Sequence, residues 1–92
     1  FKDSVCIDDE VDLKINMEKL YRFVNTALDD RERLIISKRY GLTDANGVVS
    51  RPMAQREVAK LLNISRSYVS RIEKRALEKL RSEFEKAENV AP

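Results

Sequence analysis

The chain has 92 residues, 42% of them hydrophobic and 37% charged, and its net charge is +2 at pH 7. A chain of this length forms one small domain, or two very small helical ones, with a thin core beneath a highly charged surface. Two glycines and two prolines are too few for the many turns of a β-sandwich or barrel. We therefore expect an all-α fold.

Composition also argues against several functions. The chain has no histidine, and it contains no metal-ligand cluster, glycine-rich phosphate loop or nucleophile beside a base, so we expect no enzyme, metal or cofactor. Cys6 is the only cysteine, which excludes an internal disulfide and fits a reducing cytoplasm; we expect a weakly ordered residue there rather than a reactive thiol. No apolar run approaches the ~20 residues that span a bilayer, and no signal peptide is visible, so we expect no membrane partner. The chain opens on Phe1, which suggests a fragment of a longer protein.

The charges are segregated along the chain. Residues 1–30 carry eight acids against four bases, a net of −4, whereas residues 51–81 carry nine bases against three acids, a net of +6. A positive field confined to one segment is typical of a phosphate binder, although a solvated basic face is an equally open reading at this point.

The predicted elements begin after a leading segment, residues 1–15, that lacks a helical period and that we interpret as a linker or frayed start. From Met17, apolar residues recur at the i, i+3, i+4, i+7 and i+11 spacing of an amphipathic helix. The alternation of Val11, Leu13 and Ile15 leaves the start of this helix open. The apolar positions are Met17, Leu20, Tyr21, Val24 and Leu28.

A second helix is predicted from its end signals. Asp29 and Glu32 have the D-x-x-E spacing of a capping box, which starts a new helix. Leu34, Ile35 and Ile36 are its expected buried side. Gly41 stands where a helix needs a left-handed C-terminal residue, with Leu42 as the apolar contact that folds back.

Residues 43–51 contain Asn46-Gly47 and little periodicity, and we predict a loop. Pro52 fits the first turn of a third helix that ends near residue 62. Its expected inward residues are Val58, Ala59, Leu61 and Leu62. Ser65 is a suitable N-cap for a last helix to about residue 87, which leaves residues 89–92 as a tail.

The third and fourth helices have the spacing of a helix-turn-helix over residues 54–81. The motif needs a small residue at the helix crossing, a chain reversal four residues later, an apolar plug and two apolar residues three apart. These requirements are met by Ala59, Asn63, Ile64, Val69 and Ile72. We therefore predict a small all-α domain of about four helices that ends in a helix-turn-helix.

In this motif the N-terminal half of the second helix enters the major groove of DNA. Arginine can bind guanine through two hydrogen bonds, and serine can donate to or accept from several bases. Tyr68 either braces the helices or touches a sugar or thymine methyl, with packing the safer expectation, and Glu73 is expected to pair with Arg56 or Arg39. The candidate base-reading residues are Arg66, Ser67, Ser70 and Arg71, and the candidate phosphate contacts farther along are Arg75 and Lys79.

The string QREVAKLLNISRSYVSRIEKRALEKL, Gln55 to Leu80, closely resembles region 4.2 of the sigma-70 family of bacterial sigma factors. LDDRERLIISKRYGL, Leu28 to Leu42, resembles region 4.1. The resemblance implies one region 4 domain over residues 16–88, with region 4.1 at about 16–42 and region 4.2 at about 52–81. The run SRSYVSRIEKRAL looks most like sporulation sigma factors, first sigma-K and then sigma-E.

The resemblance implies a domain that reads the −35 promoter element while docked on the flap of the RNA polymerase β subunit. Duplex promoter DNA and core polymerase are the implied partners, in the bacterial cytoplasm at the nucleoid. Carried onto this sequence, the base-reading positions are again Arg66, Ser67, Ser70 and Arg71. The DNA-backbone positions are Arg31, Arg39, Glu57 and Arg75. The core and the polymerase-facing groove would be formed around Leu20, Tyr21, Val24, Ile35 and Ile36.

The sequence departs from the family at Ala54, where relatives usually have a capping threonine. We expect Ser50 or Arg51 to cap a slightly longer helix through Pro52 instead. Two other functions stay open: a helix-turn-helix repressor or activator, and a protein-interaction module bound by an anti-sigma factor or activator. A repressor would normally dimerise, and the chain has no heptad seam long enough for that, so we expect a monomer.

Overall fold

The structure is a computed structural model that describes residues 10–43 and 46–89, with side chains described over 16–43 and 46–88. Within these ranges it consists of four helices and no strand, which confirms the all-α prediction. The helices are α1 (Glu10–Ala27), α2 (Asp30–Tyr40), α3 (Gln55–Leu62) and α4 (Arg66–Asn89). Cys6, residues 1–9 of the predicted leading segment and residues 90–92 of the predicted tail lie outside the described residues.

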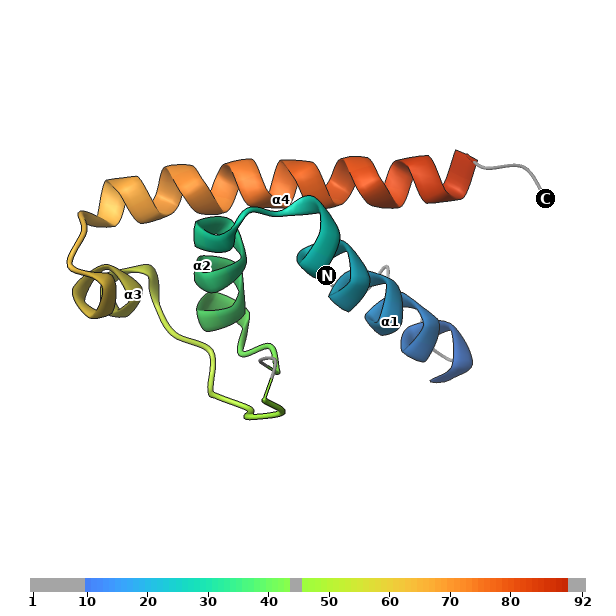
Figure 1. Cartoon of the computed structure of the whole chain (residues 1–92), viewed down its shortest axis with the longest axis horizontal. Helices are drawn as coiled ribbons and strands as arrows, with labels where there is room; N and C mark the ends of the chain where they lie inside the picture. The colour runs from blue at the N-terminus through green and yellow to red at the C-terminus, as the bar shows by residue number, and fades with distance from the viewer. Residues whose placement is uncertain (1–9, 44–45, 90–92) are drawn as a thin grey trace.

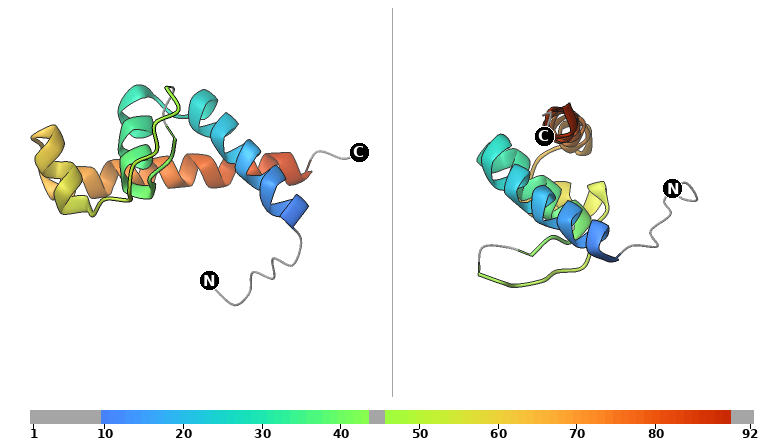
Figure 2. Two further views of the ribbon diagram at one scale, coloured as in Figure 1. Left: turned by 90° about the horizontal axis from the view of Figure 1, so that it is seen from below. Right: turned by 90° about the vertical axis from the view of Figure 1, so that its right-hand side faces the viewer.

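The longest helix, α4, runs the length of the molecule and packs against each of the other three (Figure 1). α3 lies beneath its N-terminal end, α2 crosses its middle, and α1 approaches it with its C-terminal end and runs obliquely away from it. Viewed along α4, the other helices all lie on one side of it (Figure 2). One end of the molecule is therefore formed by α3 and the first turns of α4.

The start of helix α1, which the sequence left open, lies at Glu10, so residues 10–15 of the predicted leading segment belong to the helix. The apolar periodicity that predicts this helix is visible only from Met17 onward. Residues 10–16 contain neither glycine nor proline, so nothing in the backbone prevents the helix from starting earlier.

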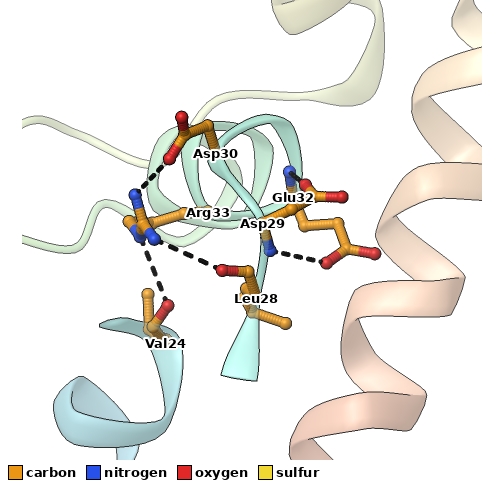
Figure 3. A network of polar contacts seen from close by, with 6 residues as sticks. All are labelled: Val24, Leu28, Asp29, Asp30, Glu32 and Arg33. Atoms are coloured by element: carbon orange, nitrogen blue, oxygen red, sulfur yellow. Dashed lines mark hydrogen bonds and ion pairs between the residues drawn. The ribbon is translucent and has the colours of Figure 1, made fainter. Parts of the chain in front are cut away.

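The joint between α1 and α2 is held by polar side chains (Figure 3). The predicted capping box is present: Glu32 N–H donates to Asp29 Oδ1 at 2.8 Å, and Asp29 N–H donates to Glu32 Oε1 at 2.9 Å. Arg33 donates to the carbonyl oxygens of Val24 at 3.4 Å and Leu28 at 3.3 Å. Arg33 thus satisfies carbonyls that the end of α1 leaves without a helical partner.

The C-terminus of α2 also follows the sequence prediction. Gly41 has φ 67° and ψ 36°, and its N–H donates to the carbonyl of Ser37. Leu42 folds back into the core, where 9% of its surface remains exposed.

Helix α3 starts later than predicted, which corrects the expected cap at Ser50 or Arg51 and the placement of Pro52 inside the helix. The N-cap is Ala54, with an extended backbone and no side-chain oxygen to bind the first turn. Its own N–H donates to Glu57 Oε1 at 2.9 Å, so half of a capping box is present. The reason for the late start is that Met53 is bound to α2: its N–H donates to the carbonyl of Lys38 at 3.0 Å.

The core consists of two clusters that meet at adjacent residues of α2. Ile36 belongs to the cluster between α1, α2 and α4, and Ile35 belongs to the cluster between α2, α3 and α4. Three leucines are exposed, two of which, Leu34 and Leu61, the sequence placed inward, and Ile64 is only partly buried. Leu61 and Leu77 lie beside the buried faces of their helices, whereas Leu34 lies on the side of α2 opposite to its buried residues. The three are Leu34 at 40%, Leu61 at 56% and Leu77 at 42% exposure.

Candidate DNA-binding surface

Helices α3 and α4 meet through the turn that the sequence predicted. Asn63 ends α3 in the left-handed conformation, with φ 57° and ψ 48°. The N–H of Ile64 donates to the carbonyl of Ala59 at 3.0 Å, and Ala59 is 7% exposed at the crossing. Val69 and Ile72 seal the crossing from α4 at 0% and 4% exposure. All five positions of the predicted motif therefore lie in or beside this junction.

The first turns of α4 present the predicted base-reading side chains to solvent. Ser65 Oγ accepts from the N–H of Tyr68 at 3.1 Å, which confirms Ser65 as the N-cap. The buried side of α4 faces α3 and α2, so the residues between the buried positions point away from the molecule. The exposed residues of these turns include Arg66, Ser67, Ser70 and Arg71.

Tyr68 lies on this exposed surface rather than in the core, which corrects the expectation of packing. Its side chain is flanked by two guanidinium groups, each with its central carbon 5.8 Å from the ring centroid. One belongs to Arg71, one turn farther along α4, and the other to Arg31 of α2. Arg31, a predicted backbone contact, is therefore brought beside the first turns of α4.

Glu73 pairs with Arg39, one of the two partners expected from the sequence, at 2.9 Å. It also accepts from Tyr40 Oη at 2.6 Å and from Gln55 Nε2 at 2.9 Å, two contacts that the sequence did not predict. Burial alone would raise the pKa of Glu73, but the bonds from Tyr40, Arg39 and Gln55 outweigh it and lower this pKa. The hydrogen bond that the Tyr40 hydroxyl donates to Glu73 also raises the pKa of Tyr40.

Arg39 and Glu57, both predicted to contact the DNA backbone, have their charged groups bonded within the protein. Arg39 donates Nη1 to the carbonyl of Met53 at 2.7 Å in addition to its bond to Glu73. Glu57 accepts hydrogen bonds from the Ala54 N–H and from Arg51. Both bonds lower the pKa of Glu57, and the bond from Ala54 has the larger effect. A charged carboxylate repels phosphate. We therefore leave Arg39 and Glu57 out of the DNA contacts and assign them to the folding of the α3 N-terminus.

Lys79, another predicted phosphate contact, is paired with Glu32 within the protein. Its Nζ lies 2.9 Å from both carboxylate oxygens of Glu32 and donates a hydrogen bond to Oε1. The Glu32 side chain is 2% exposed, so Lys79 compensates a charge that is buried between α2 and α4. The sequence offered no signal for this pair, because the two residues are 47 positions apart.

The other cations of this region are exposed and make no ion pair with another described residue. They line α3 and the outer side of α4, and they include two of the predicted base-reading residues, Arg66 and Arg71. Several polar groups at the α3 N-terminus and Arg66 also line one shallow hollow, formed by Arg39, Ala54, Gln55, Arg56, Glu57 and Arg66. The unpaired cations of α3 and α4 are Arg56, Lys60, Arg66, Arg71, Lys74, Arg75 and Arg81.

The predicted polymerase-facing residues divide into core and groove. Val24, Ile35 and Ile36 are buried at 3% or less, so Ile35 and Ile36 form core rather than a docking surface. Tyr21 is half-buried, and its hydroxyl oxygen accepts from Thr43 N–H at 3.1 Å. Leu20 packs against the first core cluster. A groove between α1 and α2 is lined by Tyr21, Val24, Asn25, Asp30, Arg33, Leu34, Ser37, Lys38, Leu42, Thr43 and Ser50.

Over the described residues, no three histidine, cysteine, aspartate or glutamate side chains group as metal ligands. None of the helices in that part of the chain is long and apolar enough to cross a membrane.

Comparison with known proteins agrees with this arrangement. The family described as Sigma-70, region 4 matches residues 26–82. The chain is 45% identical over 86 residues to the RNA polymerase sigma-28 factor of Bacillus thuringiensis subsp. kurstaki, covering 94% of the chain and 34% of that protein. It is 48% identical over 80 residues to the RNA polymerase sigma-K factor of Bacillus subtilis (strain 168), covering 87% of the chain and 25% of that protein.

A third relative is the RNA polymerase sigma-E factor of Clostridium acetobutylicum, 38% identical over 84 residues, which cover 91% of the chain and 33% of the relative. The chain thus spans between a quarter and about a third of the length of these relatives. No solved structure gives a significant match. Because the family match includes α2, α3 and the first turns of α4, the chain belongs to the Sigma-70, region 4 family.

Proposed function

We propose that the chain is the DNA-reading part of an RNA polymerase sigma factor and binds the −35 element of promoters through the first turns of α4. The single observation that carries the proposal is the exposure of four groove-reading side chains at the start of the second helix of a helix-turn-helix. They are Arg66, Ser67, Ser70 and Arg71. Family membership supplies the class of DNA.

The distribution of cations supports a role for phosphate contacts on both sides of this helix. Arg31 of α2 and Arg75 of α4 are exposed and keep their predicted roles as backbone contacts. Arg56 lies at the N-terminus of α3, where helix dipole and side chain both favour an anion. The four side chains named above then contact the bases, and the phosphate contacts fix the register of the protein on the DNA.

The groove between α1 and α2 is the proposed docking site for the flap of the polymerase β subunit. Leu34 supports this, because it is a large apolar side chain left 40% exposed on the rim of that groove. None of the four base-reading residues of α4 lines the groove, so base reading leaves the groove accessible. The resemblance to sigma-K and sigma-E extends the proposal to promoters of sporulation genes.

Selection from a library of duplexes with a randomised hexamer tests the proposal directly. We expect one hexamer to be enriched, with weak affinity for the isolated chain because a single module buries a small interface. Arg71→Ala should then relax preference at one base pair and cost roughly 1–3 kcal/mol on the enriched duplex. Arg75→Ala should weaken binding to enriched and scrambled duplexes alike.

The outcomes separate the competing functions. Absence of any enriched hexamer at moderate salt would refute promoter reading and favour a protein-interaction module. Enrichment of a palindrome with dimeric binding would identify an operator-binding repressor or activator instead. Equal loss of base preference in the Arg71 and Arg75 variants would contradict the assignment of Arg71 to the groove.

A further inference from the structure

Helix α4 carries a buried carboxylate, Glu73, that accepts hydrogen bonds from two other helices. Glu73 is 5% exposed, and its Oε1 accepts from Arg39 of α2 and Gln55 of α3, each at 2.9 Å. Its Oε2 accepts from Tyr40 of α2 at 2.6 Å. Three donors from two elements thus converge on a single side chain of α4.

These contacts fix α3 at the end opposite to its turn. The C-terminal end of α3 is joined to α4 by the short turn at Asn63. The N-terminal end is held by Gln55, the first residue of α3, through Glu73. Arg39 adds a bond to the carbonyl of Met53, just before the α3 N-cap. The N–H of Met53 also binds α2 through the carbonyl of Lys38, and Glu73 adds the side-chain contact that joins the first residue of α3 to α4. Both ends of α3 are therefore held against α4.

The position of Glu73 along α4 connects this junction to the DNA-reading face. Ser70 lies three residues before it on the exposed side, and both residues line a second shallow hollow with Gln55. The proposed phosphate contacts lie on three helices, with Arg31 on α2, Arg56 on α3 and Arg75 on α4, whereas the base-reading groups all lie on α4. A base-reading constellation has to be held within about half an ångström to be selective. The relative placement of three helices therefore matters for recognition, beyond its effect on stability.

We propose that Glu73 is a positioning residue for base reading: it holds α2 and α3 against α4 so that phosphate contacts and base contacts engage the same stretch of DNA together. The inference rests on the proposed function. A buried carboxylate would then contribute to the discrimination between hexamers through the helices that it holds. Simple loss of stability would lower binding to every duplex in the same proportion, so the two roles are separable.

The test compares Glu73→Ala with Glu32→Ala. Glu32 is a matched control, because it too is a buried carboxylate paired with a cation, Lys79, but it contacts neither α3 nor the first turns of α4. For each variant the ratio of affinities for the enriched and scrambled duplexes is measured at a temperature where circular dichroism shows the chain folded. We expect the ratio to fall roughly tenfold in Glu73→Ala, about the loss of one base contact, and to stay unchanged in Glu32→Ala.

Tyr40→Phe provides a second, milder variant, since it removes one donor and leaves the pair of Glu73 and Arg39 intact. We expect a smaller fall of the same ratio. An unchanged ratio in folded Glu73→Ala would overturn the inference, and so would an unchanged ratio in Tyr40→Phe if Glu73→Ala does not fold. A wild-type chain without any preference would instead refute the proposed function, so the two failures are distinguished by the wild-type measurement.

Discussion

Two residues end helices in the left-handed conformation, and their surroundings differ. Gly41 after α2 and Asn63 after α3 have φ of 67° and 57°. A Cβ on Gly41 would lie 2.6 Å from the carbonyl oxygen of Ser50 and 3.1 Å from Pro52 Cδ. Asn63 is exposed and already carries a side chain in this conformation. The same backbone geometry therefore tolerates different residues at the two positions.

We predict that Gly41→Ala destabilises the fold more than Asn63→Ala. Left-handed backbone costs an ordinary residue about 1–2 kcal/mol, and asparagine is among those that adopt it most readily. Asn63→Ala should therefore lower the free energy of unfolding by about 1 kcal/mol, and Asn63→Gly should be nearly neutral. In Gly41→Ala the backbone of the loop must also move, so the loss should exceed about 2 kcal/mol. Urea unfolding followed by circular dichroism measures all three, and equal losses at the two positions would show that the loop yields freely.

At the scale of helices, the sequence was informative where the signal is local. The capping box at Asp29, the left-handed Gly41 and Asn63, and the cap at Ser65 involve residues within a turn of one another, and all are present. The predicted start of α3 was wrong, because the actual start depends on a contact with another helix. The carbonyl of Lys38 in α2 accepts from the N–H of Met53. Such a contact leaves no pattern in the sequence around Pro52.

The same distinction applies to the candidate site. The exposure of the early α4 residues follows from helical periodicity, which gave the right face. The pairing of Lys79 with Glu32 and of Gln55 with Glu73 depends on how the helices cross, which the sequence does not reveal. Residue type alone therefore predicted Lys79 as a phosphate contact. Charge shows which residues can bind phosphate, whereas packing determines which of them remain available.

The N-terminus of α3 offers a prediction at this scale, because its cap is incomplete. Glu57 binds the N–H of Ala54, but Ala54 has no oxygen to return a bond to the first turn. Ala54→Thr completes the capping box and should raise the free energy of unfolding by about 1 kcal/mol. Ala54→Val, which has the shape of threonine without its hydroxyl, is the control. Thermal unfolding of the two variants should differ by that amount; a gain of the same size in both would mean that the hydroxyl makes no cap.

For the whole molecule, the distribution of ion pairs matters more than net charge. Toward the middle of α4, Lys79 compensates Glu32, and Arg39 compensates Glu73 on the side facing α2. The cations of α3 itself and of the outer side of α4 from Arg66 to Arg81 make no ion pair among the described residues. A chain with a net charge of only +2 can therefore present a strongly positive surface at one end, and that surface includes the first turns of α4.

The salt dependence of DNA binding should reveal which cations reach phosphates. Each phosphate contact contributes about −0.9 to the slope of log affinity against log salt. Arg75→Ala should therefore make the slope shallower by about 1, with little effect on stability. Lys79→Ala should leave the slope unchanged but lower the free energy of unfolding by about 2 kcal/mol, because the buried carboxylate of Glu32 loses its cation. Anisotropy titrations between low and moderate salt, with urea unfolding of the same variants, give both quantities. A shallower slope in Lys79→Ala would mean that this side chain leaves Glu32 for the DNA, and would restore the phosphate role predicted from sequence.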